Sequence, residues 1–177
     1  MAIDWMYAPF QTSFLGTPMK QLWPDFLLWE RFFQSHRIES MIEIGTGSGG
    51  LSLYFFLQAQ QRRFVFWTYD VVVPDVLGTV LGESLKKCFR RQNVWEPDFA
   101  SLVTIAPRPL LLYCDGGHKT REMQTFVPLL KPGDFAAVHD WGNEINDKDL
   151  EPIKNMITPI WKSESEELKS WTRFFST

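Results

Sequence analysis

Short apolar runs alternate with amphipathic segments along most of the chain. The runs at 40–45, 63–70, 110–115 and 135–140 are typical of buried strands, and a weaker one covers 89–93. Helical spacing is found between them, over 48–60, 80–88, 98–105 and 119–130. Because alternating strands and helices are joined by right-handed crossovers, the sequence predicts a doubly wound α/β fold, with a mostly parallel sheet flanked by helices.

The two ends of the chain are expected to complete the same domain. No repeat or linker divides the sequence, so residues 1–177 are predicted to form one domain, with a helical lead-in over 1–38, a core over 39–141 and closing elements over 142–177. A helix is predicted over 149–157 and a closing edge strand over 171–176. Only 37 residues follow Asp140, so the C-terminal edge of the sheet is a candidate for shortening or for cover by a partner.

Composition narrows the class of protein. The chain is 45% hydrophobic and 22% charged, as ordinary globular domains are. Its net charge is -3 and its basic residues cluster only in pairs, which provides no footprint for a nucleic-acid backbone. Two cysteines without disulfide or zinc spacing, and no long apolar segment, favour a cytoplasmic protein away from membranes. We expect a small-molecule partner; the many aromatic residues leave a homo-oligomer open.

The strongest chemical signal is a glycine-rich turn after the first predicted strand. Residues 43–50 read EIGTGSGG. Glycines in such a turn let a ligand approach the backbone amides at the start of the following helix. Asp70 ends the second predicted strand about 20 residues later, the spacing at which a carboxylate can chelate ribose hydroxyls. The pattern predicts a cofactor that contains a ribose, bound at the carboxyl ends of the strands.

The residue two positions before the first glycine distinguishes between cofactors. Glu43 completes the acid-x-Gly-x-Gly-x-Gly arrangement of class I methyltransferases, whereas nicotinamide-binding domains usually have an apolar residue there. The arrangement favours S-adenosylmethionine (SAM) over NAD, with Glu43 ordering the turn, Asp70 on the ribose, and Asn93 and Val94 beside the adenine. The predicted cofactor residues are Glu43, Gly45, Thr46, Gly47, Gly49, Asp70, Asn93, Val94 and Asp115.

Separated motifs between residues 14 and 141 resemble the cephalosporin hydroxylase family of class I methyltransferases. They are FLGTPMKQ at 14–21, IEIG at 42–45, YCDGGHK at 113–119, LKPGDF at 130–135 and VHD at 138–140. The resemblance implies a Rossmann-like, SAM-dependent enzyme related to sugar and antibiotic O-methyltransferases, many of which hold Mg²⁺ beside the methyl group. It implies methyl transfer to a small-molecule acceptor at a hydroxyl oxygen.

The resemblance also implies roles for residues at the ends of the fourth and fifth strands. Asp115 and Asp140 would be Mg²⁺ ligands, because Mg²⁺ accepts one or two carboxylates. His139 stands where related metal-dependent enzymes often have an acid, and histidine is a poorer Mg²⁺ ligand, so the alternative that both aspartates cap helices or bind substrate stays equally open. His118 is the predicted general base, with Lys119 as second candidate and Asp115 beside them in the catalytic set.

Two other functions are compatible with the same residues. A noncatalytic SAM-binding module would fit the short C-terminal region, and an NAD-dependent oxidoreductase would keep the fold and change the chemistry. Residues 115–118 read DGGH, unlike the Asn/Asp-Pro-Pro-aromatic motif of enzymes that methylate nucleic-acid bases. This difference further disfavours nucleic acid as the substrate.

Overall fold

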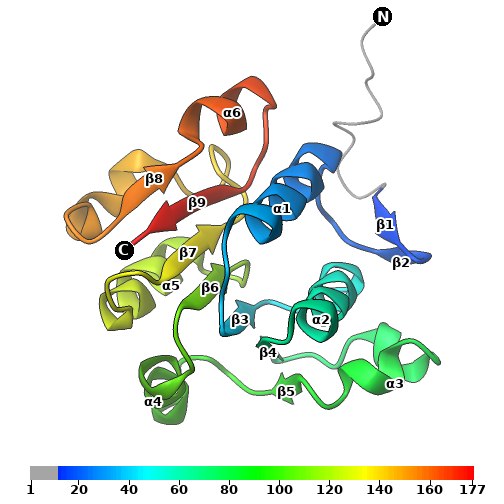
Figure 1. Ribbon diagram of the computed structural model, residues 1–177. Coiled ribbons are helices and arrows are strands. Elements are labelled where there is room, and N and C mark those ends of the chain that lie inside the picture. The colour runs from blue at the N-terminus through cyan, green and yellow to red at the C-terminus, as the bar shows by residue number, and fades with distance from the viewer. Residues whose placement is uncertain (1–11) are drawn as a thin grey trace, which may run out of the picture.

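The computed structural model describes residues 12–177, and a seven-stranded sheet lies at the centre of this part of the chain (Figure 1). The strand order is β5-β4-β3-β6-β7-β9-β8. The parallel strands are β3 (Ser40–Ile44), β4 (Val65–Asp70), β5 (Phe89–Arg91), β6 (Leu110–Cys114) and β7 (Phe135–Val138). The predicted doubly wound, mostly parallel sheet is confirmed.

Alternate residues of the central strands face opposite sides of the sheet and build two apolar clusters. Met41 and Leu111 pack with the helices α1 (Trp23–Ser35), α2 (Gly50–Arg62) and α3 (Gly82–Leu85). Ile42 and Leu112 pack on the other face, with α4 (Pro97–Ile105) and α5 (Lys119–Phe126). Trp29 of α1 is fully buried at the centre of the first cluster. These packed faces hold the strand ends in fixed positions.

The strand order reverses next to β3, and this reversal positions the candidate site. The chain runs from β3 outward to β4 and β5, then returns to β6 on the other side of β3. Ile44 pairs with Tyr69 of β4 and with Cys114 of β6, so the residues that follow these three strands meet at one edge. Ligands of open α/β sheets bind at such a reversal point.

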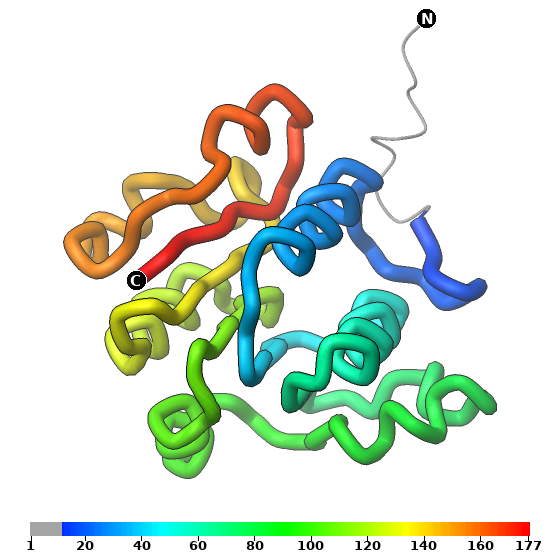
Figure 2. Tube along the Cα trace, in the orientation of Figure 1, coloured from blue at the N-terminus to red at the C-terminus, as the bar shows by residue number. Residues whose placement is uncertain are grey.

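The C-terminal edge of the sheet is complete, which corrects the expectation of a shortened edge. Strand β9 (Arg173–Ser176) pairs antiparallel with β7, and β8 (Thr158–Ile160) pairs with β9 as the outermost strand. Figure 2 shows the red C-terminal strand returning into the sheet beside the yellow β7. The segment predicted as the edge strand is therefore internal, and the edge strand β8 was missed because its short TPI sequence carries no strand pattern.

Several predicted helices are shorter than expected. The helix predicted over 119–130 ends as α5 at Phe126 and continues as the 3₁₀ helix η3 (Val127–Leu129), because Pro128 lacks the amide hydrogen that an α-helix needs. The segment 149–157 forms instead the 3₁₀ helix η4 (Asp147–Ile153), which contains Pro152. Of the helix predicted over 80–88, only the residues of α3 are helical. A one-turn helix, α6 (Lys162–Glu167), precedes β9 and was not predicted.

The predicted lead-in over 1–38 falls partly outside the described residues. Within them it contains α1, as expected, and a two-stranded hairpin of β1 (Ser13–Phe14) and β2 (Thr17–Pro18) that was not predicted. A further 3₁₀ helix, η2 (Asp75–Gly78), follows β4. No helix formed by residues 12–177 has the length and apolar character needed to cross a bilayer.

Candidate functional site

The carboxyl ends of β3, β4, β5 and β6 surround a cleft of about 530 Å³. Its walls come from the glycine turn after β3, the end of β4, residues 92–95 after β5 and residues 115–118 after β6. Six of the nine predicted cofactor residues line it, namely Gly45, Gly47, Asp70, Asn93, Val94 and Asp115. We call this hollow the cofactor cleft, after the predicted residues that line it.

Two glycines of the turn are required for different reasons. Gly45 has φ +95°, and a Cβ there would lie 2.6 Å from the carbonyl carbon of Asp115, so the close approach of β3 and β6 excludes any side chain. Gly47 has φ +55° and open space where a Cβ would be. Gly47 therefore keeps open space beside its backbone, whereas the lack of a side chain at Gly45 makes room for the backbone that follows β6.

Asp70 is fixed against the turn by two backbone amides. Its Oδ2 accepts a hydrogen bond of 2.9 Å from the amide of Gly47, and its Oδ1 accepts one of 3.0 Å from the amide of Val72. The carboxylate is half-buried and lines the cofactor cleft. Because each carboxylate oxygen can accept two hydrogen bonds, both keep capacity for hydroxyl donors of a ligand.

Glu43 and Thr46 use their side chains inside the protein. Glu43 is 1% exposed and accepts a hydrogen bond of 2.5 Å from the hydroxyl of Ser52, which ties β3 to α2. Burial, reinforced by the charges of Asp115 and Asp70, raises the pKa of Glu43 to about 8, so its carboxyl is mostly neutral at pH 7. The Thr46 hydroxyl is buried and lies 2.6 Å from that of Thr68, which leaves mainly its backbone for a ligand.

A second hollow of about 400 Å³ adjoins the cofactor cleft, and we call it the acidic hollow. It shares Gly45, Gly47 and Asp115 with the cleft, so the two spaces meet at Asp115. Its remaining walls include six titratable side chains, those of Lys20, Glu43, Lys119, His139, Asp140 and Glu144.

Lys119 lies among three acids of the acidic hollow. Its Nζ is 2.8 Å from Oδ2 of Asp140, 3.0 Å from Oε2 of Glu144 and 3.6 Å from Oδ1 of Asp115, and it donates to the carbonyl oxygen of Gly116 at 2.9 Å. Burial alone would lower the pKa of Lys119, but Asp115, Asp140 and Glu144 together raise it above its usual value. Lys119 is therefore held as an ammonium ion, which does not suit the role of base.

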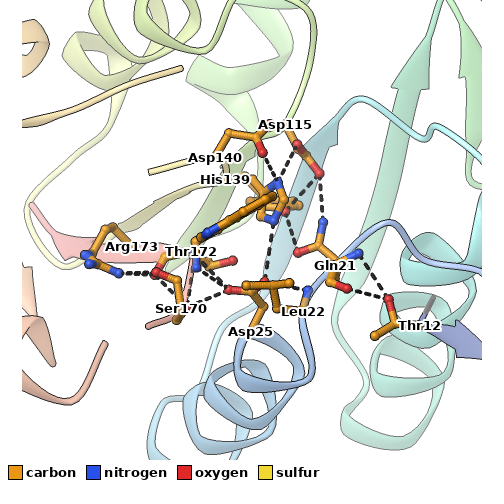
Figure 3. Close-up of polar contacts among 12 residues, drawn as sticks. Thr12, Gln21, Leu22, Asp25, Asp115, His139, Asp140, Ser170, Thr172 and Arg173 are labelled. Atoms are coloured by element: carbon orange, nitrogen blue, oxygen red, sulfur yellow. Dashed lines mark hydrogen bonds and ion pairs between the residues drawn. The ribbon is translucent and has the colours of Figure 1, made fainter. Parts of the chain in front are cut away.

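His139 contacts acids on both sides of its ring (Figure 3). Its Nδ1 lies 3.4 Å from Oδ1 of Asp115 and 3.2 Å from Oδ1 of Asp140, and its Nε2 lies 3.6 Å from Oδ2 of Asp25. Burial opposes a charge on this ring, but the three carboxylates outweigh burial and raise the pKa of His139 well above its usual value. These three carboxylates favour a proton on the ring of His139, which is 3% exposed.

Asp115 receives two further donors from the protein. The side-chain amide of Gln21 donates to its Oδ2 at 3.1 Å, and the buried hydroxyl of Tyr113 donates to the same oxygen at 3.0 Å. Asp140 has the left-handed φ of +56°, which is uncommon for a residue other than glycine and concentrates at functional sites. Asp115 is thus held in a defined orientation at the junction of the two hollows, and Asp140 lies beside it in the acidic hollow.

The side chains at this junction do not fit a bound Mg²⁺. In the described part of the chain, Asp115, His139 and Asp140 bring one potential ligand atom each within 4.8 Å of one another. However, a ring nitrogen can bind a metal only after losing its proton, and Nδ1 of His139 is directed at two carboxylates that favour the proton. The ammonium of Lys119 also lies between the same two aspartates.

The remaining predicted residues lie at the rim. His118 is exposed, precedes α5 and lines the cofactor cleft, and its backbone amide donates to Oε1 of Glu122 at 3.1 Å. Asn93 is exposed and accepts from the amide of Trp95 at 3.1 Å, while Val94 is buried in the cleft wall. Gly49 lines neither hollow.

Sequence reasoning missed Asp25 and Gln21 as members of the site. Gln21 is the last residue of the FLGTPMKQ motif, and Asp25 lies four positions later, after a proline at the start of α1. Nothing local to that segment indicates which acid it will meet, since Gln21 and Asp115 are 94 residues apart.

The fold is similar to that of solved CmcI structures. A CmcI structure with SAH matches 100% of this chain and 92% of that chain, at 14% identity and a TM-score of 0.64. A CmcI structure with Mg and SAM matches 79% of this chain and 66% of that chain, slightly less than two thirds, at 15% identity and a TM-score of 0.59. A fibrillarin/Nop5p complex matches 86% and 80% of the two chains, at 12% identity and a TM-score of 0.51.

These similarities concern the fold, because all of the identities are low. No protein-family model matches the chain, and no curated protein sequence does. The chain has the Rossmann-like fold of class I methyltransferases, and its resemblance to the cephalosporin hydroxylase-like CmcI is confirmed at the level of that fold.

Proposed function

We propose that this protein is a SAM-dependent methyltransferase that acts on a hydroxyl oxygen of a small molecule. One observation carries the proposal: the glycine turn, Asp70 and the Asn93-Val94 pair line the same cleft, although they come from three separate parts of the chain. The cleft lies at the strand-order reversal, where this class of sheet binds its ligand.

The residues of the cleft fit the parts of SAM. Gly47 leaves open space beside the backbone for the methionine end, and the fixed carboxylate of Asp70 can accept the two ribose hydroxyls. Val94 offers an apolar surface and Asn93 an amide for the adenine. When bound, SAM supplies an electrophilic methyl group and leaves as S-adenosylhomocysteine after an acceptor oxygen has taken that methyl.

The acidic hollow provides the place for the acceptor. It meets the cofactor cleft at Asp115, so a small molecule in it lies next to the cofactor. His118 lines the adjoining cofactor cleft and is exposed there, and we assign to it the proton that the acceptor hydroxyl loses, since the acids around Lys119 hold that side chain as an ammonium ion.

Titration calorimetry with SAM, S-adenosylhomocysteine and NAD tests the binding half of the proposal. We expect both sulfur compounds to bind and NAD to fail, and Asp70→Ala to weaken binding about 10- to 100-fold, because hydrogen bonds to a charged group contribute about 1.5–3 kcal/mol. Asp75→Ala is the matched control, since it removes the charge of an exposed aspartate nearby that does not line the cofactor cleft. Preferential binding of NAD would instead identify a nicotinamide-dependent protein.

Formation of S-adenosylhomocysteine with a panel of hydroxylated small molecules tests the catalytic half. For an accepted substrate, His118→Ala is expected to lower kcat about 10²- to 10⁴-fold. His36→Ala is the control, because His36 precedes β3 at the opposite end of the sheet. If SAM binds and the whole panel remains unmethylated, the noncatalytic SAM-binding module becomes the better description.

A further inference from the structure

We propose that this protein works without a divalent metal, because Lys119 and His139 take the position between Asp115 and Asp140 that such an ion would need. The proposal rests on the proposed function, since the site lies where the acceptor would bind. It assigns the cationic role in this hollow to side chains of the chain itself, and it assigns to Asp25 the role of positioning His139.

The first argument is that both positive groups already contact both aspartates. The Nζ of Lys119 is 2.8 Å from Asp140 and 3.6 Å from Asp115, and the Nδ1 of His139 is 3.2 Å and 3.4 Å from the same two side chains. A Mg²⁺ ion requires oxygen ligands at about 2.0–2.1 Å. An ion that met this requirement on both aspartates would displace two positive side chains or lie against them.

The second argument is that His139 cannot easily leave. It is 3% exposed, and behind it lies Asp25, whose side chain is 0% exposed. Asp25 is itself held by four donors: its Oδ2 accepts from the amide of Leu22, and its Oδ1 accepts from the Ser170 hydroxyl and from two backbone amides, those of Trp171 and Thr172. Figure 3 shows this arrangement, in which Asp25 joins the start of α1 to the chain entering β9.

The third argument concerns charge. A buried charge is costly unless an opposite charge compensates it. The four acids Asp25, Asp115, Asp140 and Glu144 surround the side chains of Lys119 and His139, and Lys119 is only 6% exposed. Adding a divalent ion would place it beside the ammonium of Lys119, whose Nζ lies 2.8 Å from Asp140 and 3.0 Å from Glu144.

The exclusion of metal therefore has a specific structural cause, and removing the two positive groups should create a metal site. In the Lys119→Met/His139→Glu variant, three carboxylates face one another at the junction of the two hollows. Hard oxygen ligands of this kind suit Mg²⁺ and Mn²⁺. Lys119→Met alone removes one of the two cations and tests the same idea if the double variant does not fold.

Mn²⁺ binding, measured by electron paramagnetic resonance and calorimetry on the purified protein with S-adenosylhomocysteine present, tests the proposal. At 1 mM Mn²⁺ the unaltered protein is expected to bind no stoichiometric ion. Any Mn²⁺ that it binds should be held no more tightly than by a surface carboxylate. The double variant and Lys119→Met are expected to bind at least about tenfold more tightly, and adding Asp115→Asn should abolish the gain. A tenfold gain in Mn²⁺ affinity corresponds to about 1.4 kcal/mol of binding free energy.

Lys20→Met is the matched control, because Lys20 lines the same hollow and is exposed. It removes the same charge and should create no Mn²⁺ site. The proposal is overturned if the unaltered protein binds one Mn²⁺ that Asp115→Asn abolishes, or if the folded Lys119 and His139 variants gain no affinity. Failure of S-adenosylhomocysteine to bind would refute the proposed function separately, because Mn²⁺ binding is read without turnover.

Discussion

Substituting Gly45 by alanine is expected to destabilise the fold, whereas the same change at Gly47 should mainly weaken cofactor binding. The two glycines are neighbours in one turn, and both have positive φ, +95° at Gly45 and +55° at Gly47. They differ in what surrounds them. A Cβ on Gly45 would overlap the backbone of Asp115 in the adjacent loop, and a Cβ on Gly47 would meet no protein atom within 4 Å.

The magnitudes follow from these surroundings. A left-handed backbone costs an alanine about 1–2 kcal/mol at either position. At Gly45 an overlap with backbone adds about 1–3 kcal/mol, because the strands must separate to relieve it. The free energy of unfolding should therefore fall by about 2–5 kcal/mol in Gly45→Ala and by about 1–2 kcal/mol in Gly47→Ala, out of a total of about 5–15 kcal/mol.

Urea denaturation followed by circular dichroism measures the difference. With an m-value of about 2 kcal/mol/M, the midpoint should fall by about 1–2.5 M for Gly45→Ala and by less than about 1 M for Gly47→Ala. Titration with S-adenosylhomocysteine should show the reverse order. When the loss of binding affinity is divided by the loss of stability in the same variant, Gly47→Ala should give the larger ratio. Equal midpoint shifts in the two variants would refute the assignment of Gly45 to strand packing.

Three further predictions concern the acids and the cleft wall. Because the pKa of Glu43 is raised to about 8, the folded state keeps a proton that the unfolded state loses above about pH 4.5. The free energy of unfolding should therefore fall as the pH rises from 4.5 to 8, and Glu43→Gln should flatten that decline in urea titrations. Asp25→Asn should lower the free energy of unfolding by about 3–5 kcal/mol, because it removes a fully buried carboxylate, one of the three that face His139, against less than about 0.5 kcal/mol for the exposed Asp98→Asn. Asn93→Ala should weaken S-adenosylhomocysteine binding about two- to tenfold with an unchanged melting temperature, and unchanged affinity would remove Asn93 from the adenine site.

The sequence by itself determined the central strands, the helices between them and the edge of the sheet that carries the site. Buried parallel strands must be apolar on both faces, so β3 and β6 are visible as continuous apolar runs. The turn from β3 into α2 needs glycines in sequence, and an acid ends β4, so the cofactor half of the site is encoded by short motifs.

Only the tertiary structure decided how the charged residues combine. Asp25 and His139 are 114 positions apart, and their contact depends on how α1 packs against β7 and β9. The position of β9 between β7 and β8 likewise follows from long-range pairing that no local pattern specifies. Lys119 is visible in the sequence as a candidate base, but its charge is set by acids from other loops, since electrostatic interactions depend on distances in space rather than along the chain.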